Sequence, residues 1–378
     1  MNRRTRIRLI GAALLAAVVG VTTPALAAHG SASASDLRTG YNALLADHVF
    51  LAAAALDGNS QDIATSIGSV YGPDAEKAFL PLWRKHIGMA VDYTVGLATK
   101  DKMKQDKAVA DLLGYTQDFG AFLSAANPNL PRDVVAELVK HHVLTLKSVI
   151  DPQAAANQAE AYRALRVAAG HMAMLGDPLA GAIAKQFPAK YPGDGAAPSA
   201  ALRATLNLTL REHVYLAAGA TGAALGGRKA EFEAAAAALD GNSQDLARAI
   251  GSVYGAEAER AFLPLWRRHI GFVVDYTVGA ASKDKAKQDK AVAELVAYTD
   301  DFGAFLAGAN PNLPKDTVAD LVKHHVLTLK DVIDAQAAGN QPQAWKNART
   351  AAGHMAKVAD PLASAITKQF PQRFATAY

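Results

Sequence analysis

Apolar residues recur at every third or fourth position along most of the chain, which is the period of amphipathic helices. In "AFLPLWRRHIGFVVDY", for example, Phe262, Trp266, Val273 and Tyr276 fall on one helical face. No segment shows the strict alternation of apolar and polar residues, or the enrichment in β-branched residues, that is typical of strands. The pattern therefore predicts an all-α protein.

Polar connections rich in glycine, proline and asparagine, such as "GANPNLP", separate the amphipathic segments. Alanine-rich stretches and a proline suited to a first helical turn, Pro314, support the assignment of helices between them. For the C-terminal half the pattern predicts helices over 202–224, 228–254, 256–281, 284–307, 314–336 and 342–369. We expect the second of these to be broken at Asp240, Gly241 and Asn242.

The chain repeats itself. "LDGNSQDIATSIGSVYG" at Leu56 returns as "LDGNSQDLARAIGSVYG" at Leu239, and "AFLPLWRKHIG" at Ala78 returns with the same offset as "AFLPLWRRHIG" at Ala261. The stretch 191–200, "YPGDGAAPSA", has the composition of a linker. So large a repeat predicts two tandem antiparallel helical bundles that arose by internal duplication, copy one over 36–190 and copy two over 201–378.

The two copies differ in length near their start. The chain is much shorter from His48 to Leu56 than from His213 to Leu239, so copy one lacks a stretch that corresponds roughly to "GATGAALGGRKAEFEAAA" in copy two. This stretch reads as the tip of a helical hairpin, turning at Gly226 and Gly227. We expect the shortened first hairpin of copy one to redirect its first helix, or to be replaced by exchange with another copy, and so to remove His48 from any shared site.

The N-terminus reads as an export signal. Arg3, Arg4, Arg6 and Arg8 precede the apolar run "LIGAALLAAVVGV", and a cleavage site with small residues follows near Ala27. The sequence therefore predicts a signal peptide over 1–27, a disordered mature N-terminus over 28–35, and a secreted or otherwise extracytoplasmic protein. No later segment is apolar for long enough to cross a bilayer, so no membrane insertion is expected.

Charge and composition narrow the possible functions. Removal of residues 1–27 takes away four arginines and no acidic residue, which leaves 35 basic against 35 acidic residues. A mature chain with no net charge and no basic cluster has no electrostatic footprint for nucleic acid. The absence of cysteine excludes disulfides and thiolate metal sites. A protein partner is not indicated by any feature of the sequence.

Four predicted helices in each copy carry one histidine on the apolar face. In copy two the four are His213, His269, His325 and His354, and in copy one they are His48, His86, His142 and His171. His141 and His324 are expected to point outward. An unpartnered buried imidazole costs about 1–3 kcal/mol, so four of them in one bundle suggest a shared ligand. We expect the four histidines of each copy to converge on a metal ion.

Neutral imidazoles without thiolates suit copper, zinc or iron, and they disfavour calcium and magnesium. Haem b is a further alternative, with two imidazoles as axial ligands or with Met172 or Met355 as an axial thioether. The alternative to a bound metal or haem is a cofactor-free structural or protein-interaction module, in which each histidine makes ordinary hydrogen bonds in the core. No Glu-x-x-His pair, hydrolase motif or phosphate-binding loop is present, so the sequence leans away from an enzyme.

The segments "LWRRHIGFVVDYT", "ANPNLPKD" and "HMAMLGDPLAGAIAKQFP" carry a family resemblance. There the chain resembles a group of exported bacterial helical proteins that are often labelled after copper amine oxidase N-terminal domains. The resemblance spans both copies and implies that copper is the first metal to test. Together with the histidine pattern it gives the expected function, a secreted protein that holds a transition metal through inward-facing histidines.

Overall fold

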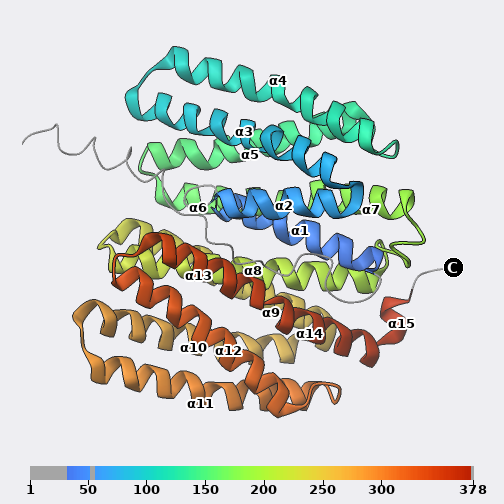
Figure 1. Cartoon of the computed structure of the whole chain (residues 1–378). Helices are drawn as coiled ribbons and strands as arrows, with labels where there is room; N and C mark the ends of the chain where they lie inside the picture. Colours follow the sequence, from blue (N-terminus) through green and yellow to red (C-terminus); the bar gives the residue numbers. More distant parts are fainter. Residues whose placement is uncertain (1–31, 52–55, 376–378) are drawn as a thin grey trace, which may run out of the picture.

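The protein is helical throughout the part that the structure describes, residues 32–51 and 56–375 of a computed structural model (Figure 1). No strand occurs in these residues, which confirms the prediction of an all-α fold. The predicted signal peptide and its cleavage site lie outside the described residues. The helices of the first half, residues 36–190, are α1 (Ala34–Leu51), α2 (Leu56–Tyr71), α3 (Pro73–Thr99), α4 (Lys102–Ala126), α5 (Arg132–Ala154), α6 (Gln158–His171) and α7 (Ala173–Gln186).

The second half, which begins at residue 201, repeats this order of helices. A connection without helical structure, residues 187–197, joins it to the first half and includes most of the predicted linker, 191–200. Its helices are α8 (Pro198–Leu225), α9 (Lys229–Tyr254), α10 (Ala256–Ser282), α11 (Lys285–Ala309), α12 (Lys315–Ala337), α13 (Gln341–His354), α14 (Ala356–Gln369) and the short α15 (Pro371–Phe374). That the two halves arose by duplication stays a prediction drawn from the sequence.

Equivalent local signals end and start the helices of both halves. Lys100 and Lys283 close α3 and α10 with left-handed backbone angles, φ of 58° and 57°. In the next residues, the side chains of Asp101 and Asp284 accept hydrogen bonds from the amides of Lys104 and Lys287 and cap α4 and α11. Such caps satisfy amides that have no partner within the helix. The repeated sequence therefore produces repeated helix boundaries.

Three boundaries differ from the prediction. The helix α9 runs unbroken through Asp240, Gly241 and Asn242, because Asn242 is buried and donates from its amide to the Thr209 carbonyl on α8. The predicted helix 342–369 is instead two helices, α13 and α14, which meet at Met355. At the N-terminus, α1 begins at Ala34, two residues inside the segment expected to be disordered.

The helices form a stack of layers in which α1 and α8 lie at the centre, and α4 and α11 lie at opposite ends (Figure 1). The helix α1 packs on α7 and α2 of its own half and on α8 of the other half. The helix α8 packs on α9, α12, α13 and α14. Both central helices are consequently buried on nearly all sides, which suits their mostly apolar sequences.

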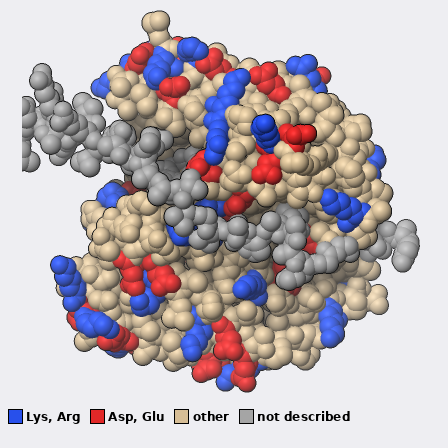
Figure 2. Space-filling view, in the orientation of Figure 1, with Lys and Arg blue, Asp and Glu red and all other residues tan. Residues whose placement is uncertain are grey.

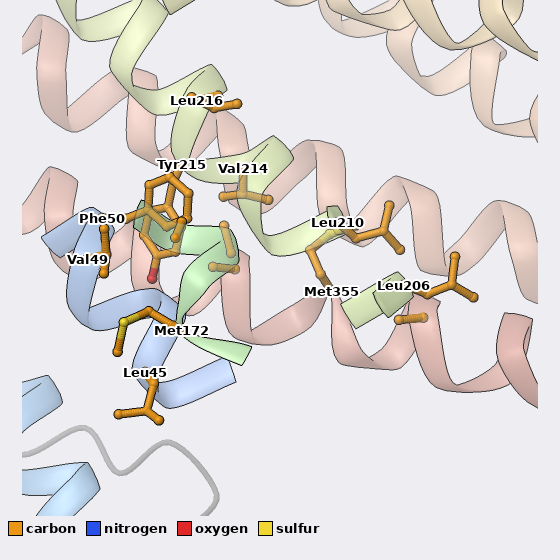
Figure 3. Close-up of a cluster of buried hydrophobic side chains, with 14 of the residues drawn as sticks. Leu45, Val49, Phe50, Met172, Leu206, Leu210, Val214, Tyr215, Leu216 and Met355 are labelled. Atoms are coloured by element: carbon orange, nitrogen blue, oxygen red, sulfur yellow. The ribbon is translucent and has the colours of Figure 1, made fainter. Parts of the chain in front are cut away.

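The two halves meet across a joint apolar core. Phe50 of α1 stacks on Tyr215 of α8 with ring centroids 5.0 Å apart (Figure 3). Val49, Val214 and Leu216 are buried in the same core. Stacked aromatic pairs of this kind add to the stabilisation that burial of their area provides. The side chains in this core come from both central helices, so the halves share one continuous interior.

Reciprocal ion pairs border this joint core. Arg166 of α6 pairs with Asp245 of α9, and Arg349 of α13 pairs with Asp62 of α2. The second pair repeats the first with the two halves exchanged, as in a twofold interface between equal partners. On the face seen in Figure 2, basic and acidic side chains are interspersed. Among the described residues, no helix is long and apolar enough to cross a membrane.

Candidate metal centres

Three helices of the first half bring histidines to one point in the core. His48 lies on α1, His86 on α3 and His142 on α5, and each falls on the apolar face of its helix. On α3 the buried Phe79 and Trp83 precede His86 by seven and three residues, which places all three on one face. The amphipathic pattern therefore directs the imidazole into the bundle.

The three imidazoles of the first half form a compact cluster, which we call the first triad. One nitrogen from each of His48, His86 and His142 lies within 4.8 Å of the others, and the side chains are 2–4% exposed. The Nε2 atoms of His48 and His86 are 3.2 Å apart. Two nitrogens bound to a tetrahedral ion at about 2.0–2.1 Å lie about 3.3 Å apart, so this spacing fits shared coordination.

The second half contains an equivalent cluster, the second triad, made of His213 on α8, His269 on α10 and His325 on α12. Their ligand atoms also lie within 4.8 Å of one another, and the side chains are 1–4% exposed. The Nε2 atoms of His213 and His269 are 3.4 Å apart. The two triads thus lie on equivalent helices of the two halves, and their histidines have nearly the same spacing.

Aromatic rings surround each triad and hold its imidazoles in place. The ring of His86 lies 4.6 Å from that of Trp83 and 5.2 Å from that of Tyr115, measured between centroids. Trp266 and Tyr298 stand at the same distances from His269. The two tyrosines come from α4 and α11, whose contribution to the site the sequence analysis missed. Their position four residues before another buried aromatic, as in "YTQDF", was the available signal.

Several ring nitrogens of the triads lack a hydrogen-bond partner. Both nitrogens of His142 and both of His325 are buried without one, and so are the Nδ1 atoms of His48 and His213. A buried polar atom without a partner costs about 1–3 kcal/mol. Imidazole nitrogens normally meet such a requirement with a protein group, a water or a metal ion. His142 and His325 therefore have unused binding capacity within their clusters.

The triad histidines are neutral at physiological pH. Burial, followed by the proximity of His142, lowers the pKa of His86 to about 3, and the same causes, with His325 as the neighbour, lower that of His269 to about 3. Burial lowers the pKa of His142 and His325 to about 4. Metal ions bind the neutral imidazole, so no proton has to leave these rings before coordination.

The fourth histidine predicted for each half lies outside its triad. The Nε2 of His354 donates to the Leu321 carbonyl at 3.2 Å, and the ring stacks on that of His324 with centroids 4.9 Å apart. In the first half, His171 lies 5.8 Å from the ring of His141. The structure thus brings together three of four histidines in each half. As predicted, His141 and His324 are exposed.

His48 is a full member of the first triad, which corrects the expectation that the shortened hairpin would remove it. The missing segment begins beyond His48 in the aligned halves, and α1 is held along its length by α7 and α8. The direction of the helix at His48 is therefore set by packing that both halves share. Copy two does not have the more complete histidine cluster.

A small apolar cavity adjoins each triad. The first, about 50 Å³, is lined by His86, His142 and the fully buried Met172, and the second, about 40 Å³, by His269, His325 and Met355. Each methionine is the residue directly after the fourth histidine, at the break between two helices. A thioether, which is a weak and soft donor, thus lines the same cavity as two imidazoles of each triad.

Comparisons with protein-family models, with curated proteins and with solved structures found no match for this chain. The resemblance to exported bacterial helical proteins labelled after copper amine oxidase N-terminal domains therefore stays a prediction. What the described residues provide is two buried groups of three histidines, each close enough to hold one metal ion.

Proposed function

We propose that the protein binds one transition metal ion in each triad and acts outside the cytoplasm in the storage, sensing or scavenging of that metal. The observation that carries this proposal is the state of His142 and His325. Each is 4% exposed, has no hydrogen-bond partner at either ring nitrogen, and lies against two other buried imidazoles. A shared ion satisfies three such groups at once.

Copper is the metal we propose to test first. The triads offer neutral nitrogen donors, and Met172 and Met355 line the same cavities. Thioethers favour Cu(I), whereas imidazoles alone suit copper, zinc and iron. A singly charged ion is also the least costly to bury, because the residues that line these two cavities include no carboxylate to balance its charge. The resemblance stated from the sequence points to the same metal.

Export is the second part of the proposal. It rests on the arginines and the apolar run of residues 1–27 and on the small residues near Ala27. Storage, sensing and scavenging differ in the fate of the ion rather than in its binding site. Deep burial of both triads favours slow release, which suits storage or scavenging.

A cofactor-free structural or interaction module is the second candidate. The Nε2 atoms of His48 and His86, 3.2 Å apart, are at hydrogen-bond distance, so two neutral rings in opposite tautomers satisfy each other there. Haem is less well supported than a single ion. Three imidazoles converge on one point, and the cavity of about 50 Å³ beside the first triad has no room for a porphyrin.

Metal analysis of the full chain after gel filtration tests the proposal. We expect two equivalents of metal in the wild type, one in His142→Gln or His325→Gln, and none when both are replaced. The matched controls are His141→Gln and His324→Gln, because these exposed histidines are the direct chain neighbours of the replaced residues. Both controls should retain two equivalents.

Two results would overturn the metal proposal. Retention of two equivalents by the double variant would assign the metal to groups outside the triads. A folded wild type that binds neither copper nor zinc nor iron would leave the triads as core histidines. Saturation at about 100 times the dissociation constant should raise the free energy of unfolding by about 2.7 kcal/mol for each site, which gives an independent readout.

A further inference from the structure

The second triad has a larger cavity on its other side. A cavity of about 280 Å³ lies between α8, α9 and α10, with His213 and His269 among its lining residues. At its outer end it is lined by Val274 and Val278, which are 40% and 46% exposed. From His269 to Val278 the helix α10 rises about 13 Å, so the cavity leads from the surface to the buried imidazoles.

The walls of this cavity offer no free polar group apart from the imidazoles. Thr221 and Thr277 are the other polar residues of the lining, and the Thr221 hydroxyl donates to Gln336 Oε1 while the Thr277 hydroxyl donates to the Val273 carbonyl. The other lining residues are aliphatic or aromatic. An occupant must therefore have an apolar body, and its only strong polar contact must be at the triad.

Part of the wall comes from the segment that the first half lacks. Ala220, Thr221, Ala224 and Phe232 line the cavity and belong to the stretch "GATGAALGGRKAEFEAAA", which has no counterpart in the first half. This stretch forms the end of α8, the turn at Gly227 and the start of α9. The first half therefore has no residues to form this part of the wall.

A metal ion held by three protein ligands has a coordination position left for a ligand from outside. Three neutral imidazoles contribute no charge, and the cavity is lined by no charged side chain. An ion bound at the second triad therefore carries an uncompensated positive charge next to an apolar cavity. A monoanionic donor reduces this charge, and an apolar chain attached to the donor fills the space behind it.

We propose that a metal ion bound at His213, His269 and His325 takes a small monocarboxylate with an apolar chain as its additional ligand, with the chain lying in the cavity between α8, α9 and α10. The inference rests on metal binding at the second triad and names the ligand class of that site. The volume is close to the lower limit of about 300 Å³ for pockets that take small molecules.

Octanoate and Co(II) are suitable probes for this site. Two full-length double variants each keep one intact triad. The variant with His86→Gln and His142→Gln keeps the second triad. The variant with His269→Gln and His325→Gln keeps the first. We expect octanoate to change the visible Co(II) spectrum of the chain with the second triad and to leave that of the other chain unchanged. Octanoate should bind at least about fiftyfold more tightly than acetate, since each buried methylene adds about fourfold.

Octan-1-ol and a filled cavity provide the controls. Octan-1-ol has the chain without the charge and should bind at least tenfold more weakly than octanoate. Ala220→Leu should weaken octanoate binding at least tenfold and leave Co(II) affinity within about twofold. Ala224→Leu, from a less buried position on the same wall, replaces it if the first variant does not fold.

The outcomes separate this inference from the metal proposal. Failure of both triads to bind any of Co(II), copper, zinc and iron overturns both proposals. Co(II) binding at the second triad without a spectral response to octanoate overturns the carboxylate ligand alone. An equal response from the two single-triad chains, or equal octanoate affinity with and without Co(II) in calorimetry, also overturns it.

Discussion

The two triads have the same spacing, although the helical hairpins beside them differ greatly in length. His48 is followed within the described residues by only three further positions of α1, whereas His213 is followed by twelve more positions of α8. The nitrogen atoms nevertheless stand 3.2 Å and 3.4 Å apart in the two halves. The shared geometry therefore depends on how the helix middles pack, and the hairpin end can vary without disturbing the imidazoles.

The halves also differ where they meet. Asp47 of α1 pairs with Arg211 of α8, and their side chains are 6% and 10% exposed. The residue that aligns with Arg211 in the first half is Ala46, so this pair has no reciprocal partner. On the other side of the interface Glu212 pairs with Arg166, whose side chain is 24% exposed. The two central helices thus place one buried and one partly solvated ion pair near the two triads.

The largest predicted effect comes from breaking the buried pair. Arg211→Met leaves the Asp47 carboxylate buried without its partner and should lower the free energy of unfolding by about 3–5 kcal/mol. Arg166→Met, the control that removes the partly solvated pairs with Glu212 and Asp245, should cost about 1–2 kcal/mol. Urea unfolding of the metal-free chain measures both. Equal losses would show that the asymmetry in burial has no energetic consequence.

A compensating change sharpens this prediction. Replacing both members, Asp47→Leu with Arg211→Met, removes the unpaired charge and should recover most of the loss. A double variant as unstable as Arg211→Met alone would assign the loss to the aliphatic part of the arginine rather than to the stranded carboxylate.

The second prediction concerns the loss of stability at acidic pH, which we expect to be equal for the two triads. The folded-state pKa of each triad histidine lies below the value of about 6.5 expected in the unfolded chain, so the unfolded state binds more protons as pH falls. The contribution of these histidines to the free energy of unfolding is therefore fully present above pH 6.5, and it is lost as the pH falls towards 4. The titratable groups around each triad are its own imidazoles, a buried tyrosine (Tyr115 or Tyr298), the nearby fourth histidine (His171 or His354) and the ion-paired carboxylate beside it in the chain (Asp47 or Glu212).

Near pH 5 each such histidine contributes a slope of about 1.4 kcal/mol per pH unit. When the pH falls from 6.5 to 5, the free energy of unfolding of metal-free His142→Gln should decrease by about 1.5 kcal/mol less than that of the wild type. His325→Gln should show the same difference. Urea unfolding at the two pH values measures this difference. A wild type whose stability is independent of pH over this range would contradict the prediction.

The amphipathic period was sufficient to predict the fold class and the inward direction of six histidines. His354 is also buried, but its expected place in the cluster was wrong, because the sequence suggested one helix over 342–369 in which His354, Val358 and Leu362 share a face. The helix ends instead at His354, whose Nε2 donates a hydrogen bond to the Leu321 carbonyl. A helix end that tertiary packing creates has no strong local signal here, since the nearest glycine, Gly353, lies inside α13.

The large cavity beside the second triad was not predictable in the same way. Its residues are mostly alanines, valines and threonines that read as ordinary core positions, and the space between them depends on how far apart α8, α9 and α10 pack. The charge asymmetry at Asp47 and Arg211 was equally hidden, because each lies on a helix with a mostly apolar sequence. Periodicity identifies which face is buried, and it does not give the distance to the neighbouring face.

The third prediction concerns a close approach that both halves repeat. A methyl group at Gly120 of α4 would lie 2.5 Å from the Arg132 carbonyl oxygen, and one at Gly303 of α11 would lie 2.6 Å from that of Lys315. Gly120→Ala and Gly303→Ala should each cost about 1–3 kcal/mol, because the helix pair must separate. Thermal unfolding should show matching losses. A clearly smaller loss in one half would reveal that its helix pair is more loosely packed.

The smallest predicted effect uses a difference that already exists between the halves. Gly114 lies exposed in the interior of α4, next to Tyr115, and a methyl group there meets no atom within 4 Å. The aligned residue of α11, next to Tyr298, is Ala297, which is also exposed. Glycine in a helix interior costs about 0.8–1.0 kcal/mol relative to alanine, because it loses more backbone freedom on folding. Gly114→Ala should therefore stabilise the chain by about that amount, and Ala297→Gly should destabilise it equally, in chemical unfolding at neutral pH.

Metal stoichiometry should stay unchanged in both variants, since neither position points towards a triad. If one change is less than half the size of the other, the equivalence of α4 and α11 as supports for the two triads does not hold.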